Sequence, residues 1–390
     1  MKDRKVYCLN AISAVGTDNF RTGYSLTDQL DDAAGVMVRS AKMHDMEFPP
    51  SLRAIARAGA GVNNIPLECC SEAGIVVFNT PGANANSVKE LVLAGMLLAS
   101  RDLLGGAAWV RENARDPAIA KSAEKAKKAF AGHEIAGKTL GVVGLGAIGW
   151  RVANAAIDLG MKVISYDPYM SLSSAWHLSP QVGNTSDLGE LAAQSDFLTV
   201  HVPAGDKTSK MISVDIIARM KPGATLLNFA RDIVVDEEAV AASLQAGKLH
   251  KYVTDFANPL TANLSGAIVL PHLGASTEEA EDNCALMAAQ QLQNYLDNGN
   301  ITNSVNFPAI DLGVCETASR VCVLHRNEPN MLSQITGFFG KAGLNIENLA
   351  NKSRGAYAVT LLDIDETMPH DTAERLGDIA GVLRVRRIEG

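Results

Sequence analysis

The chain has 390 residues, of which 47% are apolar and 20% charged, a globular composition that excludes disordered, collagen-like and fibrous proteins. At about 100–200 residues per domain, this length predicts two to four domains. Lys and Arg number 35 against 43 Asp and Glu, a net charge of −8, so we expect no nucleic-acid partner and no anionic membrane surface. An anionic substrate must therefore be captured by a local cluster of cations.

The N-terminus and the cysteines predict a cytoplasmic protein. The first residues lack the apolar core and cleavage site of a signal peptide. The most apolar run, Leu91–Ala99, is shorter than the ~20 residues that span a bilayer. The 6 cysteines show no Cys-x-x-Cys pair and no zinc-ligand spacing, so we expect reduced thiols and no metal site.

Short β-branched runs alternate with Ala-rich helical stretches over most of the chain, which predicts doubly wound parallel sheets. The predicted strands are Gly35–Val38, Arg53–Ala56, Ile75–Phe78, Thr139–Val143, Lys162–Tyr166, Phe197–His201, Thr225–Phe229 and Ala267–Leu270. Two long helical patterns, Ser87–Ser100 and Thr277–Asn298, separate two such blocks, and the second helix can return to the first block. We therefore predict a discontinuous first domain (1–87 and 281–308) and a second domain (88–280).

The C-terminal stretch has a different order of elements. Strands are predicted at Val321–His325, Ala356–Ile364 and Leu383–Ile388, and helices at Asn330–Ala342 and Thr372–Ile379. A short unit of the βαββαβ type fits a ferredoxin-like domain over residues 317–390.

A glycine-rich turn joins a predicted strand to a predicted helix in the second block. Thr139–Val143 leads into a GxGxxG pattern whose glycines are Gly144, Gly146 and Gly149. In this context the pattern predicts a dinucleotide site, because the first glycine permits the tight turn, the second admits the pyrophosphate and the third lets the helix pack closely. The helix N-terminus supplies unpaired N–H groups and a partial positive charge to the phosphates.

Asp167 ends the next strand and predicts which dinucleotide binds. Its carboxylate would accept hydrogen bonds from the adenosine ribose, and its charge repels a 2′-phosphate. No Arg or Lys follows at once, so we predict NAD rather than NADP. The alternative is a glycine turn in a Rossmann-like domain that binds no nucleotide.

Polar motifs follow the later strands of this block at their carboxyl ends, where a doubly wound sheet holds its ligands. Arg231 follows one of these strands and His272 another. Oxidation of a 2-hydroxy acid needs a cation to hold the carboxylate and a base to take the hydroxyl proton while hydride leaves. Arg231 and His272 suit these two roles. The alternatives are a surface charge at Arg231 and a packed or capping histidine at His272.

With these motifs the chain resembles the D-specific 2-hydroxyacid dehydrogenase superfamily, and most closely its branch that oxidises 3-phospho-D-glycerate at the start of serine synthesis. The resemblance rests on Arg57–Val62, Asn79–Pro81, Gly141–Gly149, Asn228–Arg231 and Pro271–Thr277. It implies an NAD-dependent oxidoreductase of the α/β class. The implied domains are a flavodoxin-like substrate domain, a Rossmann domain and a C-terminal ferredoxin-like ACT domain.

The resemblance also implies roles for individual residues. It makes Arg231 and His272 catalytic and places the third catalytic position on Asn258, where the family has Glu. Asn can orient the histidine ring but carries no charge. Besides the glycines and Asp167, the implied cofactor contacts are Ala147, Ile148, Val202, Phe229, Ala230, Asp255, Gly274 and Ala275.

For the substrate phosphate or carboxylate, the resemblance implies contacts from Arg39, Arg57 and the turn Gly59, Ala60 and Gly61. Ordinary surface arginines are the alternative there. The ACT unit implies L-serine as a candidate effector, held by His325, Asn327 and Asn345. A purely dimerising ACT unit is the alternative. Members of the superfamily associate, so we expect a homodimer or homotetramer.

Two other functions fit parts of this pattern. One is an NAD-dependent dehydrogenase of another small 2-hydroxy acid, against which the ACT unit and the two arginines argue. The other is a catalytically weak NADH-sensing partner protein, whose only support is the missing glutamate at Asn258.

Overall fold

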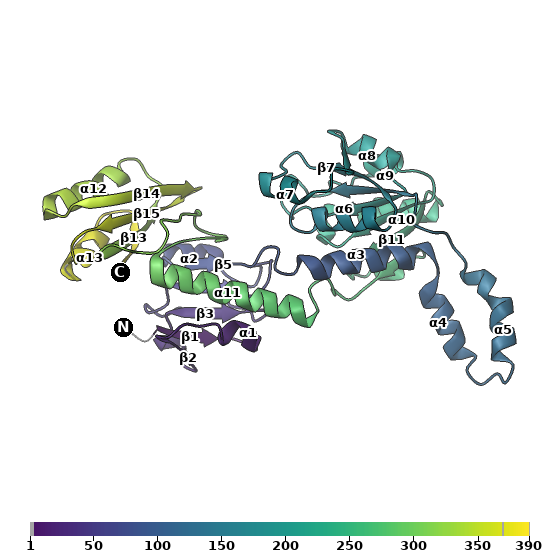
Figure 1. Cartoon of the computed structure of the whole chain (residues 1–390), viewed down its shortest axis with the longest axis horizontal. Coiled ribbons are helices and arrows are strands. Elements are labelled where there is room, and N and C mark those ends of the chain that lie inside the picture. Colours follow the sequence, from purple (N-terminus) through teal and green to yellow (C-terminus); the bar gives the residue numbers. More distant parts are fainter. Residues whose placement is uncertain (1–3, 369, 390) are drawn as a thin grey trace. The chain divides into compact units, whose positions relative to one another are not determined.

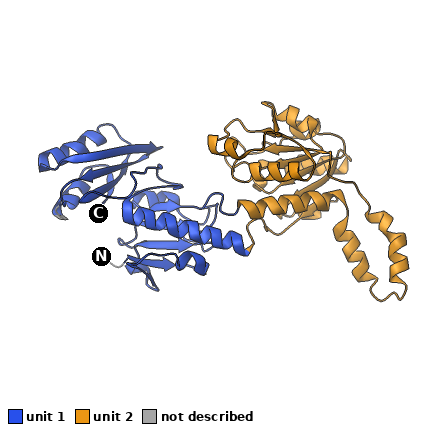
Figure 2. Cartoon of the chain, viewed as in Figure 1, with its two compact units in different colours: residues 1–84, 278–390 blue, residues 85–277 orange. Residues whose placement is uncertain are grey.

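The computed structural model describes residues 4–368 and 370–389. The chain folds into two compact units. One is formed by residues 1–84 with 278–390 and the other by residues 85–277 (Figure 2). We call them unit 1 and unit 2. Unit 1 holds two sheets, so the division into three domains that the sequence predicts stays a prediction.

The first sheet of unit 1 has five parallel strands in the order β2-β1-β3-β4-β5, which is the flavodoxin-like order. Its strands are β1 (Arg4–Cys8), β2 (Tyr24–Thr27), β3 (Gly35–Val38), β4 (Ala54–Arg57) and β5 (Val76–Phe78), and its helices are α1 (Ala14–Thr17), α2 (Leu67–Glu72) and α11 (Glu278–Asn298). Helix α11 packs against β3, β4 and β5 (Figure 1). A Cβ atom on Gly35 would lie 2.8 Å from the Leu292 side chain, so the glycine permits this close packing.

Unit 2 is built on a seven-stranded parallel sheet in the order β12-β11-β10-β9-β6-β7-β8, which is the Rossmann order with one added strand. Its strands are β6 (Thr139–Val143), β7 (Lys162–Tyr166), β8 (Gly183–Asn184), β9 (Phe197–Val200), β10 (Ala224–Asn228), β11 (Leu249–Thr254) and β12 (Ala267–Val269). Its helices are α3 (Ala85–Ser100), α6 (Gly149–Asp158), α7 (Leu172–His177), α8 (Leu188–Gln194), α9 (Val214–Arg219) and α10 (Glu237–Gln245). Helices α3 and α6 bury one apolar layer against the sheet, and α8, α9 and α10 bury a second.

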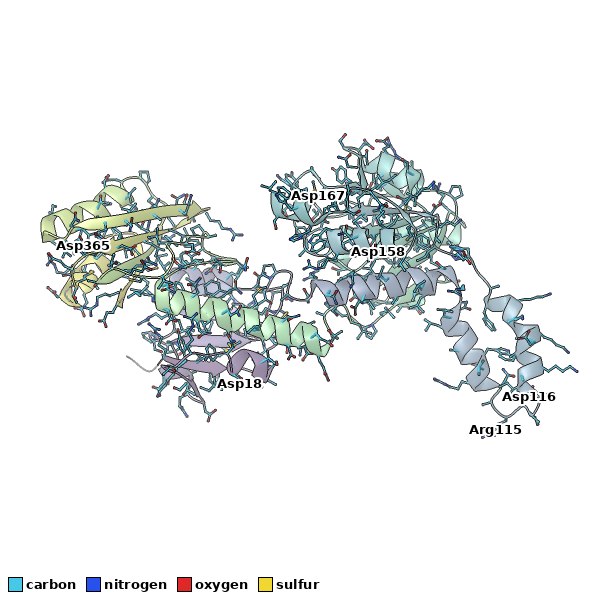
Figure 3. The ribbon with its side chains drawn as sticks, in the orientation of Figure 1. Asp18, Arg115, Asp116, Asp158, Asp167 and Asp365 are labelled. Atoms are coloured by element: carbon cyan, nitrogen blue, oxygen red, sulfur yellow. The ribbon has the colours of Figure 1, made fainter. Side chains whose placement is uncertain are left out.

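Two further helices, α4 (Leu103–Glu112) and α5 (Ile119–Ala126), form an arm on unit 2 and bury none of their residues (Figure 1). Arg115 and Asp116 lie at the far end of this arm (Figure 3). Over the described part of the chain, no single helix is long and apolar enough to cross a membrane. Helices α3 and α4, bent by 69° at their junction, pass that test as a pair on length and composition alone.

The second sheet of unit 1 is antiparallel, in the order β14-β15-β13-β16. Its elements are β13 (Ser319–Arg326), α12 (Met331–Ala342), β14 (Ile346–Arg354), β15 (Tyr357–Ile364), α13 (His370–Gly377) and β16 (Val382–Glu389). This is the ferredoxin-like arrangement, so the predicted fold class is confirmed: two doubly wound sheets and a small antiparallel sheet at the C-terminus.

The ferredoxin-like sheet shares one hydrophobic core with α11 and the first sheet. The α11 side chains Leu292, Tyr295 and Leu296 belong to the same buried cluster as one face of the ferredoxin-like sheet. That face contributes Cys322, Leu324, Val359, Leu361 and Ile388. The two sheets of unit 1 are therefore joined by burial of apolar surface.

A buried ion pair reinforces this junction. The Arg320 side chain is 1% exposed, and its Nε donates to Asp363 Oδ1 at 2.6 Å. Its Nη1 donates to the carbonyl oxygens of Asn298 and Gly313 at 3.1 and 2.7 Å. One guanidinium therefore joins β13 and β15 to the end of α11 and to the segment after it.

Replacing Arg320 by Met leaves the Asp363 carboxylate buried without its partner, so we expect R320M to lower the free energy of unfolding by ~3–5 kcal/mol. The double variant R320M/D363L removes both charges and is expected to lose less. Urea unfolding of the full chain measures both. An R320M variant as stable as the wild type would contradict the role given to this pair.

Candidate active site

The glycine-rich turn of unit 2 is tight and open to solvent. Gly144 has φ = +87°, and a Cβ there would lie 2.6 Å from the His201 carbonyl oxygen. A Cβ on Gly149, the first residue of α6, would lie 1.9 Å from the Gly144 carbonyl oxygen. Around Gly146, by contrast, a Cβ would meet no atom within 4 Å. The turn therefore offers accessible backbone at the N-terminus of α6, which fits a pyrophosphate group.

This turn lies at the topological switch point of the sheet, where β6 has β7 on one side and β9 on the other. Asp167 follows β7 and holds the turn in place (Figure 3). Its Oδ2 accepts a hydrogen bond from the Leu145 amide at 2.7 Å, and its Oδ1 accepts one from the Tyr169 amide at 2.8 Å. Each oxygen keeps a further lone pair for a ribose hydroxyl.

Arg231 lies after β10 in a loop that Asn228 shapes. The Asn228 side chain is fully buried; its Oδ1 accepts from the Ala230 amide at 3.1 Å and its Nδ2 donates to the Arg231 carbonyl at 2.9 Å. The Arg231 guanidinium donates to the Ala230 carbonyl at 2.7 Å and, in the described chain, pairs with no carboxylate. It is therefore available to an anionic ligand.

Asp255 follows β11 and hydrogen-bonds the loop that carries His272. Its carboxylate is 2% exposed, and Oδ2 accepts from the Gly274 amide at 3.0 Å, while its carbonyl accepts from the His272 amide at 2.9 Å. Burial raises the pKa of Asp255, whereas the Gly274 hydrogen bond and the charges of His272 and Arg231 lower that pKa. Both catalytic candidates therefore lie near one carboxylate. Its Oδ1 is buried without a hydrogen-bond partner among the described residues, so it can serve a bound cofactor.

The His272 ring is exposed and packs at a tilt against Phe256, with 5.0 Å between ring centroids. The backbone of His272 is left-handed, with φ = +50°. A non-glycine residue takes this conformation only where its surroundings hold it. The hydrogen bond from its amide to Asp255 is one such restraint.

Asn258 hydrogen-bonds to groups other than His272. Its Oδ1 accepts from the amides of Leu260 and Thr261 at 2.9 and 3.0 Å, and its Nδ2 donates to Glu237 Oε2 at 2.7 Å. The Tyr252 hydroxyl donates to the other oxygen of Glu237 at 3.2 Å. An orienting role of Asn258 toward His272 therefore stays a prediction.

Sequence reasoning missed Glu237. It lies in the first turn of α10, and burial raises its pKa, opposed by the hydrogen bonds from Asn258 and Tyr252. The sequence pair Asp236-Glu237, just after the arginine loop, could have pointed to Glu237. Such acidic pairs are also common at the N-termini of ordinary helices, so the pattern alone does not indicate a functional residue. Its contact with Asn258 depends on the fold.

The other predicted cofactor positions surround the same edge of the sheet. Ala147 is exposed and Ile148 half-buried in the glycine turn, Val202 follows β9, and Ala230 and Ala275 are half-buried in their loops. Phe229 is only 5% exposed and packs against Gly95 of α3. It can offer its backbone to a cofactor but not its ring.

The predicted substrate residues belong to unit 1 and lie on neighbouring strands. Arg57 Nε donates to the carbonyl of Arg39 at 3.0 Å, and Arg39 pairs with Glu281 of α11 at 2.6 Å. Gly59 has φ = +156°, a backbone conformation that other residues rarely adopt, so this turn favours a glycine. With Ala60 exposed and Gly61 half-buried, two guanidinium groups and accessible backbone gather at one edge of the first sheet.

The predicted effector residues differ in exposure. His325 is 2% exposed; its Nε2 lies 2.9 Å from Thr360 Oγ1, its Nδ1 lies 2.8 Å from the Arg326 carbonyl, and burial lowers its pKa. Asn327 and Asn345 are exposed, and their amides donate to the Gly355 carbonyl at 3.1 Å and to Asp365 Oδ2 at 3.4 Å. Both ring nitrogens of His325 already have partners within the chain.

Comparison with known proteins adds the family. Residues 93–274 match the family described as "D-isomer specific 2-hydroxyacid dehydrogenase, NAD binding domain". The chain is 33% identical over 358 residues to D-3-phosphoglycerate dehydrogenase of Haemophilus influenzae, covering 87% of this chain and 82% of that protein. The chain belongs to the D-3-phosphoglycerate dehydrogenase family.

Members of this family differ from this chain in length. The enzyme of Methanocaldococcus jannaschii is 36% identical over 315 residues, which cover 77% of this chain but 58% of that protein. Among solved structures, the NAD+-bound 3-phosphoglycerate dehydrogenase of Entamoeba histolytica has a TM-score of 0.60 and 26% identity, covering 78% of this chain and 99% of that one. A glyoxylate/hydroxypyruvate reductase of Sinorhizobium meliloti has a TM-score of 0.65 and 20% identity over 77% of this chain and 97% of that one, which shows a shared fold.

As a member of this family the chain is an oxidoreductase with NAD as its cofactor, as the sequence predicts. The open glycine turn, Asp167 and the unpartnered oxygen of Asp255 fit that cofactor. No group of three or more metal-binding side chains occurs among residues 4–368 and 370–389.

The predicted role of Asp167 is to accept hydrogen bonds from the ribose and to repel a 2′-phosphate, and replacing it by Ser removes the charge on which both depend. We expect D167S to raise the KM for NAD about tenfold or more and to improve the use of NADP, since hydrogen bonds to charged groups contribute ~1.5–3 kcal/mol. The control is D158N, at the exposed end of α6 in the same unit. Initial rates with both cofactors measure the ratio, and an unchanged preference in D167S would contradict the role of Asp167.

The environment of His201 predicts that acid lowers the free energy of unfolding. Its Nδ1 is buried without a described partner, and burial lowers the pKa of the ring to about 3. The unfolded chain binds a proton on this histidine below pH ~6.5 whereas the native chain does not, so acid favours unfolding. Between pH ~6.5 and ~3 this group should lower the free energy of unfolding by at most ~1.4 kcal/mol per pH unit.

The variant H201Q lacks this titration and should therefore lose less stability than the wild type between pH 7 and pH 4.5. Urea unfolding at several pH values measures the difference in slope. Parallel pH dependences in H201Q and the wild type would contradict a ring that stays neutral in the native chain.

Proposed function

We propose that the chain catalyses the NAD-dependent oxidation of 3-phospho-D-glycerate to 3-phosphohydroxypyruvate, the first step of L-serine biosynthesis. The observation that carries this proposal is that Arg231, Asp255 and His272 follow the neighbouring strands β10, β11 and β12, at the sheet edge that also holds the glycine turn. The names of the curated relatives support the substrate, since those proteins are D-3-phosphoglycerate dehydrogenases.

In this proposal Arg231 binds the substrate and His272 transfers the proton. The Arg231 guanidinium binds the substrate carboxylate through two parallel hydrogen bonds and fixes its orientation. His272 accepts the proton of the 2-hydroxyl group and returns it in the reverse reaction. When bound, NAD supplies the hydride acceptor. The Asp255 carboxylate stabilises the positive charge that His272 gains.

The substrate phosphate is assigned to unit 1. Arg39 and Arg57 supply two guanidinium groups on adjacent strand ends, and the turn after Gly59 supplies the backbone N–H groups of Ala60 and Gly61. This arrangement favours a phosphorylated substrate over a small unphosphorylated 2-hydroxy acid, because phosphate needs cations beyond the one that holds the carboxylate.

L-Serine is proposed as an effector of the ferredoxin-like sheet, which we assign as an ACT domain. Asn327 and Asn345 offer amide groups at the surface for a small amino acid. His325 would have to exchange its contact with Thr360 or Arg326 for the ligand. Calorimetric titration with L-serine tests this: no heat, and no loss of activity at millimolar serine, would remove it. A homodimer or homotetramer and a cytoplasmic location complete the proposal.

The decisive assay compares NADH oxidation with phosphohydroxypyruvate, glyoxylate and pyruvate. We expect the highest kcat/KM with phosphohydroxypyruvate. A preference for glyoxylate or pyruvate would instead indicate a dehydrogenase of another small 2-hydroxy acid, and no turnover with any of them would indicate an NADH-binding partner protein.

The histidine role has its own test. We expect H272Q to lower kcat about 10²–10⁴-fold, the usual contribution of a general base, with little change in NAD binding. The matched control is H250Q, an exposed histidine at the opposite end of β11 from Asp255. Loss of activity in H250Q equal to that in H272Q, or full activity in H272Q, would contradict the assignment.

A further inference from the structure

A large cavity opens inside unit 1, away from the carboxyl edge of its first sheet. Its volume is ≈ 1290 Å³, and its walls come from β1, β2, the end of α11 and the edge strand β16. Both sheets of unit 1 therefore line it. Small-molecule sites typically measure about 300–1,000 Å³, so this cavity can hold a metabolite with its water.

Three arginines meet on one side of this cavity. Arg53 directly precedes β4, and Arg384 and Arg386 lie two residues apart on one face of β16. We call these three residues the arginine cluster. Besides burial, the charge of Arg386 lowers the pKa of Arg53, and the charges of Arg53 and Arg386 lower the pKa of Arg384. Burial is the larger cause for both, and it holds the pKa of Arg384 at about 10.

The hydrogen bonds of the cluster go to uncharged groups. Arg386 donates to the carbonyl oxygens of Tyr295 and Leu296 at 3.0 and 2.9 Å and stacks 4.3 Å from the Tyr295 ring centroid. Arg384 donates to one carbonyl oxygen, that of Leu52, and Arg53 donates to that of Pro50. Most of the donor capacity of Arg53 and Arg384 is therefore unused.

Three of the four carboxylates that line the cavity pair with other cations, and the fourth, Glu374, is exposed and forms no ion pair among the described residues. Arg4 pairs with Asp297, Lys5 with Asp32 at 2.9 Å, and Arg387 with Glu389. Within residues 4–368 and 370–389, no carboxylate forms an ion pair with Arg53, Arg384 or Arg386. A half-buried group of three cations without an ion-paired acid repels itself, and a bound anion would relieve that repulsion.

We propose that the arginine cluster and its cavity form a second binding site, for a small metabolite with a phosphate or carboxylate group. The planar forks of Arg53 and Arg384 match such oxyanions in geometry as well as in charge. The ligand neutralises the cluster and contacts both sheets of unit 1. Its binding therefore stabilises the packing of the ferredoxin-like sheet on α11.

The test counts anions bound per chain by isothermal titration of the full protein, with inorganic phosphate in one arm and citrate in the other. We expect R384Q to bind one anion fewer than the wild type, or to bind it at least about tenfold more weakly, because a hydrogen bond to a charged group contributes ~1.5–3 kcal/mol. Anions held elsewhere, including at Arg39 and Arg57, are common to both proteins and cancel in the comparison. The arm that shows the difference identifies phosphate or carboxylate as the recognised group.

Two further variants serve as controls for this comparison. K5Q removes one positive charge from the same cavity, but from a cation that already has a carboxylate partner, and it should bind anions like the wild type. R384K keeps the charge without the fork and should bind with intermediate affinity. In buffer without phosphate or carboxylates, R384Q should melt no lower than the wild type, because it relieves repulsion between like charges.

Three results would overturn the proposal: equal anion binding by R384Q and wild type, equal losses in K5Q and R384Q, or a lower melting temperature of R384Q in anion-free buffer. The last would mean that Arg384 acts through its hydrogen bond to Leu52. If R384Q instead changes the oligomeric state and leaves anion binding unchanged, an acidic surface of a second chain occupies the cavity. None of these outcomes depends on the dehydrogenase activity.

Discussion

The candidate active site of unit 2 depends on one buried carboxylate, that of Asp255. Withdrawing a carboxylate from water is costly unless hydrogen bonds and opposite charges offset the loss. Here Oδ2 binds the Gly274 amide, and the charges of Arg231 and His272 lie close enough to lower its pKa against the effect of burial. The carbonyl of the same residue holds the amide of His272, whose backbone is left-handed. The loop that carries His272 and Gly274 is thereby held on one residue, Asp255, which follows β11.

A second group of side chains forms a hydrogen-bonded network next to the Arg231 loop. Asn228 shapes the Arg231 loop and lies 3.5 Å from the Tyr252 hydroxyl, which in turn donates to Glu237. Asn258 completes the group by donating to the same carboxylate. This arrangement gives a physical reason for asparagine at 258: a glutamate there would face Glu237 within hydrogen-bond distance, and two carboxylates so close repel each other. The family's acid is absent at 258, and a carboxylate from α10 stands beside that position.

The sequence predicts much of this because local patterns suffice for it. Continuous apolar runs indicate the buried parallel strands, and a glycine pattern between strand and helix has few other uses. Strand β14 was missed because its sequence, Ile346–Arg354, is polar and largely exposed at a sheet edge, so it lacks an apolar alternation. The contact between Glu237 and Asn258 was also missed, since it joins residues from separate elements. The burial of His325 and the core shared by the two sheets of unit 1 likewise depend on tertiary packing.

The most direct test of the role of Asp255 is the turnover of D255N. Asparagine can still accept the Gly274 hydrogen bond through Oδ1, so the loops should keep their arrangement while the charge is lost. We predict that D255N melts at or above the wild-type temperature, because a buried charge has been removed, and that its kcat falls at least about tenfold, because the charge gained by His272 is no longer stabilised. A D255N enzyme with wild-type kcat would contradict the account. So would a D255N chain that loses activity only because it unfolds, since Asp255 would then stabilise the fold and not the charge on His272.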